Sequence, residues 1–282
     1  PPPTRADAPD PTVHIENRTI PRQGDKSDLL MRIYQPAKRT ASQALPALLW
    51  IHGGGFIVGD VYSEEGLCEQ IVSACNCVVV SVDYRLAPQH PFPAGLDDCH
   101  TALSWLRSSA LEELSIDKNR IAIGGVSAGG CLAAGLALRN RDEGGHKLIF
   151  QVLMIPVIDD RHETPSSHSI TDPRVWNRSV SLKAWDAYLK DIKCEVTSYA
   201  APGRADDLTG LPPTFVSVED QDLLRDEGIA YAQGLMQAGV QTELHVYPGT
   251  FHGSVFAPDA NVSRRHRHDM KQALNRAFWR AT

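Results

Sequence analysis

Short apolar runs alternate with amphipathic stretches along most of this chain. Two alternating segments, at 13–21 and 29–34, predict an antiparallel pair around a turn near Gly24, and further strands are predicted at 47–51, 78–83, 121–124, 150–155, 214–218 and 242–247. Helical patterns lie at 64–73, 95–108, 130–139, 226–238 and 260–280. This alternation predicts an α/β fold with a mostly parallel, eight-stranded sheet covered by helices on both faces, and a site at the carboxyl edge of the strands.

The stretch between 155 and 214 interrupts this rhythm. It places four aromatic residues among polar ones, with a helical pattern near 181–190; the aromatic residues are Trp176, Trp185, Tyr188 and Tyr199. A connection of this length with so many aromatic residues predicts a folded lid, the alternative being a surface excursion whose aromatic side chains pack inward. The 282 residues, 42% of them hydrophobic, fit one domain over 1–282 with a short proline-rich extension at 1–12.

A serine lies where a predicted strand turns into a predicted helix. Gly125-Val126-Ser127-Ala128-Gly129 follows the apolar run 120–124 and precedes an Ala/Leu-rich stretch. In such an elbow the turn is so tight that glycine is required on both sides, and the serine hydroxyl is raised toward a substrate. The five-residue motif alone is weak, but its place between strand and helix strengthens it.

Three consecutive glycines follow an earlier strand. The run 48–51 leads directly into His52-Gly53-Gly54-Gly55. A backbone without Cβ atoms lets its N–H groups come close to a developing oxyanion. Alone the triplet is an ordinary glycine turn; after a strand and upstream of a serine elbow it favours an oxyanion loop.

A serine nucleophile needs a base, and His252 is the histidine in the right place. It follows the alternating strand 242–247 through a Pro-Gly turn. His245 lies inside that strand, His266 and His268 belong to the basic last helix, and the other histidines that compete precede the acidic segment. Because the base comes last in the order Ser, Asp/Glu, His, the sequence predicts His252.

The acid that orients the base is less clearly marked. Asp220, Asp222 and Asp226 all follow the strand 214–218. Asp226 fits the first turn of the next helix, where a carboxylate favours the helix dipole. Position alone favours Asp222 over Asp220 without deciding between them.

Together these motifs resemble the hormone-sensitive-lipase-like branch of the α/β-hydrolases, the esterases with a His-Gly-Gly-Gly loop. The matching stretches run from about 46 to 256, and they are His52–Gly55, Tyr84–Pro88, Gly125–Gly129, Asp222–Glu227 and Phe251–Gly253. The resemblance implies Ser127 as nucleophile, Asp222 as acid and His252 as base. It also implies an oxyanion hole made by the N–H groups of Gly54, Gly55 and Ala128, and a cap at about 160–208 over the acyl or alcohol pocket.

The expected function is a serine carboxylesterase of the EC 3.1.1 type that acts on short-acyl, uncharged esters without metal or organic cofactor. An amidase, deacetylase or lactonase would use the same groups, and a ligand-binding receptor on an inactivated hydrolase is the alternative from another class. The net charge of −6 argues against nucleic-acid partners, and no apolar run is long enough to span a membrane. Six cysteines without a regular framework predict a cytoplasmic protein, although secretion stays open, as does a homodimer.

Overall fold

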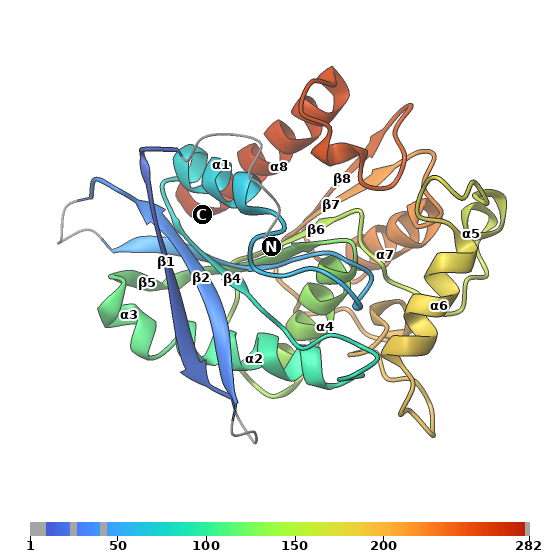
Figure 1. Ribbon diagram of the computed structural model, residues 1–282, viewed down its shortest axis with the longest axis horizontal. Coiled ribbons are helices and arrows are strands. Elements are labelled where there is room, and N and C mark those ends of the chain that lie inside the picture. The colour runs from blue at the N-terminus through green and yellow to red at the C-terminus, as the bar shows by residue number, and fades with distance from the viewer. Residues whose placement is uncertain (1–9, 23–26, 40–43, 280–282) are drawn as a thin grey trace.

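The computed structural model describes residues 10–22, 27–39 and 44–279, which form an eight-stranded sheet with helices on both faces (Figure 1). The strands are β1 (Val13–Pro21), β2 (Asp28–Pro36), β3 (Leu45–Ile51), β4 (Val78–Val82), β5 (Ile116–Val126), β6 (Phe150–Met154), β7 (Thr214–Glu219) and β8 (Thr242–Tyr247). The helices are α1 (Glu65–Cys75), α2 (Ala94–Leu106), α3 (Ser109–Glu113), α4 (Ala128–Asp142), α5 (Pro165–Ser169), α6 (Arg178–Tyr188), α7 (Arg225–Gln237) and α8 (Asn261–Trp279).

The strands follow the order β1-β2-β4-β3-β5-β6-β7-β8 across the sheet. β2 pairs antiparallel with β1 and β4, and the remaining neighbours are parallel. The predicted mostly parallel sheet is therefore confirmed, with the antiparallel pair at its amino-terminal edge.

Alternation along a strand supplies both faces of the sheet with apolar side chains. In β3, Leu48 and Trp50 belong to the core cluster shared with α1 and α8, whereas Leu49 and Ile51 belong to the cluster shared with α2, α4 and α7. α1 and α8 pack together on one face of the sheet, and α2, α4 and α7 cover the other (Figure 1). Burial on two faces explains why β3 reads as a continuous apolar run.

Element boundaries differ from the sequence predictions at several points. β5 begins at Ile116, earlier than the predicted strand 121–124, and the five-residue helices α3 and α5 were not predicted. The helix predicted near 181–190 is α6, shifted toward the amino terminus. The turn near Gly24 and residues 1–9 of the predicted extension lie outside the described residues.

Among the loops that leave the sheet at its carboxyl edge, four follow β3, β5, β7 and β8. These four loops carry the glycine triplet, Ser127, the acidic segment and His252, in that order. Parallel neighbours end at the same edge, so residues more than a hundred positions apart are delivered to one place. Within the described part of the chain, no helix combines the length and the apolar character that crossing a bilayer requires.

Candidate active site

Ser127 occupies a strained turn between β5 and α4. Its backbone angles are φ 55° and ψ −118°, a left-handed conformation that costs a non-glycine residue about 1–3 kcal/mol. The backbone at Gly129 passes close to the end of β3. A Cβ added to Gly129 would lie only 2.0 Å from the carbonyl oxygen of Ile51. The glycine of the motif is therefore a packing requirement, and the helix that starts at Ala128 fixes the serine at the sheet edge.

The structure brings the three predicted triad side chains together. The hydroxyl of Ser127 is 2.9 Å from Nε2 of His252, and Nδ1 of His252 is 2.6 Å from Oδ2 of Asp222. The carboxyl group of Asp222 is buried and also accepts the N–H of Leu224 at 3.1 Å. This arrangement leaves Nε2 of the imidazole to accept the serine proton, with Nδ1–H donating to the carboxylate.

The two competing acids have other contacts. Oδ1 of Asp220 accepts the N–H groups of Gly249 and Thr250, at 2.8 and 3.2 Å, and so holds the loop that leads to His252. Asp226 lies in the first turn of α7, as the sequence predicts, and accepts the N–H of Ser166. The contact with the imidazole is made by Asp222.

The glycine loop takes a conformation that side chains would obstruct. Gly54 has φ 112°, and a Cβ there would lie 1.9 Å from the carbonyl oxygen of Val58. The N–H groups of Gly54, Gly55 and Ala128 have no hydrogen-bond acceptor among the described residues. They are the donors that the family resemblance implies for an oxyanion hole.

A cavity of about 310 Å³ opens above the serine hydroxyl. Gly54, Gly55, Ser127 and His252 line it, together with mostly apolar side chains, which are Ile57, Val58, Val126, Ile155, Trp176 and Phe256. Trp176 comes from the 160–208 segment. Its ring lies over Gly55, where a Cβ would meet it at 2.5 Å, and its centroid is 5.9 Å from that of His252.

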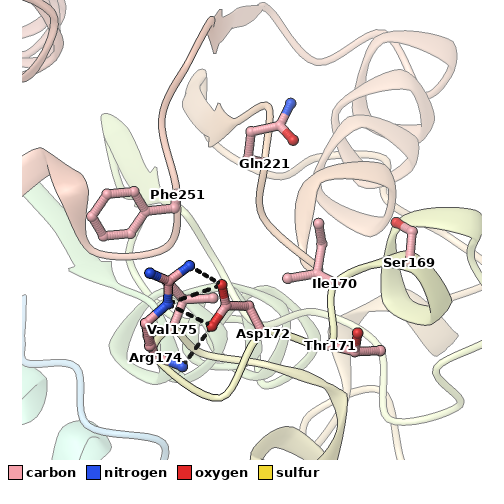
Figure 2. A pocket seen from close by; sticks show the side chains of 8 residues that line it. All are labelled: Ser169, Ile170, Thr171, Asp172, Arg174, Val175, Gln221 and Phe251. Carbon is pink, nitrogen blue, oxygen red and sulfur yellow. Dashed lines mark hydrogen bonds and ion pairs between the residues drawn. The ribbon is translucent and has the colours of Figure 1, made fainter.

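A second hollow, of about 590 Å³, lies next to the histidine loop. Figure 2 shows it between Phe251, Gln221 and the 169–175 segment, with the ion pair of Arg174 and Asp172 at one side. Phe251, half exposed, precedes His252 directly. The 160–208 segment thus borders the site on the side of the acid and histidine loops.

A second carboxyl group lies beside the triad. Glu219, the last residue of β7, is fully buried, and its Oε1 accepts the hydroxyl of Ser254 and the N–H of Val255. Burial raises the pKa of Glu219 to about 7, although a positive charge on His252 acts against this. Burial lowers the pKa of His252, but the charge and hydrogen bond of Asp222, with the charge of Glu219, raise it above the usual histidine value.

Replacing Glu219 by Gln is expected to move the acid limb of kcat/KM to lower pH, by less than about 1 pH unit. Hydrolysis requires neutral His252, and removal of a nearby negative charge makes the imidazole easier to deprotonate. Gln keeps an acceptor for Ser254 and Val255. A pH–rate profile checks this, with Glu243→Gln as control, because Glu243 bonds His245 on the neighbouring strand. A limb that moves to higher pH would contradict the assignment.

The same three groups are those best placed for a metal ion. Among the described residues, ligand atoms of Glu219, Asp222 and His252 lie within 4.8 Å of one another. His252 and Asp222 are already joined through Nδ1 and Oδ2, and Nε2 contacts Ser127. These contacts are those by which His252 takes the serine proton while Asp222 orients the ring, so we assign His252 and Asp222 to that role.

Sequence reasoning missed two carboxyl groups of this site, Glu219 and Glu64. Glu64 lines the cavity and accepts the N–H of Gly53 at 2.9 Å. Glu219 ends an apolar run, which is a signal of placement at the carboxyl edge. Glu64 looks like an ordinary first-turn acid of the predicted helix, and nothing local distinguishes it.

The structure has a serine hydrogen-bonded to a histidine, and that histidine hydrogen-bonded to an aspartate, next to backbone N–H groups that are unpaired within the described residues. This arrangement at the carboxyl edge of the sheet defines an α/β-hydrolase. A family model described as the alpha/beta hydrolase fold matches residues 48–256. The chain belongs to this family, in the hormone-sensitive-lipase-like branch to which its motifs point.

Relatives of this chain are named as esterases. Esterase LipI of Mycobacterium tuberculosis is 37% identical over 256 residues, covering 88% of this chain and 78% of the relative. The arylesterase of Saccharolobus solfataricus is 34% identical, covering 86% and 78%. A solved structure of a bacterial heroin esterase is 43% identical with a TM-score of 0.93, covering 98% of this chain and 87% of that one.

Proposed function

We propose that this protein is a carboxylic ester hydrolase that cleaves short-acyl, uncharged esters through a covalent acyl-enzyme on Ser127. The observation that carries the proposal is the hydrogen-bonded chain from Ser127 through His252 to Asp222, at 2.9 and 2.6 Å, beside the glycine loop. Relatives that match this chain over most of their length are named as esterases, which supports the reaction class.

In the first half of the reaction, His252 removes the proton of Ser127 as the oxygen attacks the ester carbonyl. The negative charge that forms on the carbonyl oxygen is stabilised by the N–H groups of Gly54, Gly55 and Ala128. One such donor contributes about 3–4 kcal/mol to the transition state. The charge on Asp222 stabilises the imidazolium and keeps the ring in the orientation that transfers the proton.

The first half ends when the imidazolium protonates the departing alcohol and the acyl group remains on Ser127. In the second half, water takes the place of the alcohol, loses its proton to His252 and attacks the acyl carbonyl. The same N–H groups stabilise the second oxyanion, and the acid leaves as Ser127 recovers its proton.

The cavity supports small, uncharged substrates. Its volume of about 310 Å³ and its mostly apolar lining suit an acetyl or butyryl group. Glu64 is the acidic side chain in the lining, and it would disfavour an anionic acyl group.

We propose further that residues 160–208 act as the cap. Two aromatic residues of α6 anchor the segment, because the rings of Trp185 and Tyr188 lie 5.3 and 4.0 Å from that of Phe56, directly after the glycine triplet. Trp176, by contrast, reaches the cavity. The aromatic residues of the segment therefore divide between anchoring it and lining the pocket.

Trp176→Ala is expected to raise kcat/KM for octanoyl esters relative to butyryl esters by about 10-fold. Removing the ring enlarges the cavity, and a few methylene groups in an apolar pocket account for a discrimination of this size. Turnover of p-nitrophenyl esters of increasing acyl length checks this. Leu182→Ala on the exposed side of α6 is the matched control. An unchanged preference would count against the cap.

The proposed function is tested with purified protein and three small, uncharged substrates. p-Nitrophenyl butyrate and the butyryl anilide share one acyl group and differ in the leaving group, so they separate esterase from amidase. A small lactone, which is a cyclic ester, tests for lactonase activity. Ester turnover at least tenfold above the other two supports the proposal. Faster anilide or lactone turnover reassigns the activity, and saturable binding without turnover would indicate a receptor.

We also propose a cellular location and an oligomeric state. All six cysteines are free and five are buried, which favours a reducing, cytoplasmic location. A homodimer is tested by gel filtration with light scattering.

A further inference from the structure

Glu64 stands at the start of α1 but does not cap it. The residue occupies the N-cap position of Glu65–Cys75, and its side chain makes no hydrogen bond to the first turn of that helix. The side chains that usually cap a helix here, those of Ser, Thr, Asp and Asn, accept an N–H of the first turn. Here the side chain turns away from its own helix, toward the loop that follows β3.

Both carboxylate oxygens of Glu64 find donors at that loop. Oε1 accepts the backbone N–H of Gly53 at 2.9 Å, and Oε2 accepts the indole N–H of Trp50 at 2.7 Å. Trp50 belongs to β3 and is fully buried, so it is a fixed point of the sheet. The carboxylate therefore joins the end of the central strand to the first glycine of the triplet, and it also lines the cavity with Ser127.

We propose that Glu64 is a positioning residue for the oxyanion hole: its carboxylate anchors Gly53 to Trp50, and so presents the N–H groups of Gly54 and Gly55 to the oxyanion. The inference rests on the proposed ester hydrolysis at Ser127, and it assigns a role to a residue outside the triad.

A glycine triplet needs such an anchor. Glycine has no side chain through which packing could fix its backbone, and it loses more conformational freedom on ordering than any other residue. Oxyanion donors stabilise a transition state only when they are already aimed at the charge that forms. Two hydrogen bonds to one partly buried carboxylate, which is itself held by a rigid strand, fix the backbone at the start of the triplet.

Protonation of Glu64 weakens the anchor. A carboxylate accepts at both oxygens, whereas a carboxylic acid carries a hydrogen on one of them and cannot accept both N–H groups equally. Burial raises the pKa of Glu64 to about 7, and the hydrogen bonds from Gly53 and Trp50 offset this only in part. The anchor therefore strengthens as the pH rises through the pKa of Glu64.

Several titratable groups belong to this part of the structure. The charge of Glu64 acts on Cys68 of α1 and on Tyr84 after β4, and His252 lines the same cavity. The charged groups that act on Cys68 or on His52 are Arg32, Asp60, Glu65 and Glu69. Burial raises the pKa values of Cys68 and Tyr84, and lowers that of His52 to about 4, so these three are neutral near pH 7. Glu64 and His252 are thus the two cavity groups expected to titrate on the acid limb.

Glu64→Gln tests the proposal in the full-length protein. The amide keeps the shape but turns one acceptor into a donor, which then faces the N–H of Gly53 or of Trp50. We expect kcat for p-nitrophenyl butyrate to fall about 10-fold with KM changed less than about 2-fold. Affinity for a trifluoromethyl ketone, whose adduct with Ser127 carries an oxyanion, should fall in parallel. The ionisation of Glu64 should disappear from the acid limb.

Glu65→Gln is the matched control on the same helix, since Glu65 forms an ion pair with Arg32 of β2. An active Glu64→Gln protein with unchanged kcat, ketone affinity and acid limb would overturn the inference while leaving the proposed function intact. A wild-type protein that is inactive on every ester would instead contradict the proposed function.

Trp50→Phe decides the matter if Glu64→Gln does not fold, as judged by its thermal unfolding curve. This variant keeps an aromatic ring in the core and removes the indole N–H. Loss of a donor to the carboxylate raises the pKa of Glu64, so the acid limb should move to higher pH. A limb that stays in place would overturn the inference.

Discussion

Ser127→Ala should lower kcat for p-nitrophenyl butyrate by about 10⁶-fold, to the limit set by contaminating activity. The loss is this large because His252 and Asp222 act only through the serine oxygen, to which Nε2 of His252 is bonded at 2.9 Å. Alanine removes one hydroxyl from a mostly buried position and leaves the strained elbow in place, so the thermal unfolding midpoint should stay close to that of the wild type.

The measurement combines steady-state turnover with covalent labelling. Wild-type protein should gain the mass of one fluorophosphonate adduct, and Ser127→Ala should gain none. Ser81→Ala, which removes a buried hydroxyl from β4, is the matched control and should keep both turnover and labelling. Turnover that survives in Ser127→Ala would remove Ser127 from the role of nucleophile.

Asp222→Asn should lower kcat by about 10⁴-fold, whereas Asp220→Asn should change it less than about 3-fold. An amide beside Nδ1 of His252 loses the charge that stabilises the imidazolium and favours the wrong tautomer of the ring. The side-chain amide in Asp220→Asn would keep an oxygen for the N–H groups of Gly249 and Thr250, which is the contact that Asp220 makes.

Steady-state kinetics at pH 8 compare the two variants, with circular dichroism to confirm that both are folded. Each variant is the matched control for the other, because both remove one carboxylate charge from the same loop. If Asp220→Asn were the more damaging change, the acid of the triad would have to be reassigned.

The elbow and the glycine loop were predictable from sequence because their constraints are local. A Cβ at Gly129 or Gly54 would collide with backbone oxygens about 2 Å away, so the conformation leaves a mark in the residue type itself. The strands were predictable for a similar reason, since burial on both faces produces continuous apolar runs. The helices α3 and α5 are five residues long, too short for a helical period to be read.

The rest of the site depends on contacts between segments that sequence does not join. Asp222 and Asp220 differ by two positions and follow the same strand, and only the placement of the histidine loop separates an imidazole partner from backbone partners. Glu64 reaches back to Trp50, and Glu219 reaches forward to Val255. Composition likewise could not distinguish Trp176, which lines the cavity, from Trp185, which packs into the core.

The position of the strands also makes the three triad residues unequal in their resistance to local opening. Ser127 leaves β5, which has neighbours on both sides, whereas His252 leaves β8, which ends the order of the described strands and is only half-buried along most of its length. Edge segments with few buried contacts fray at a smaller cost in free energy than the centre of a sheet. We therefore expect warming to separate His252 from its partners while Ser127 is still held, so that activity is lost below the temperature of global unfolding.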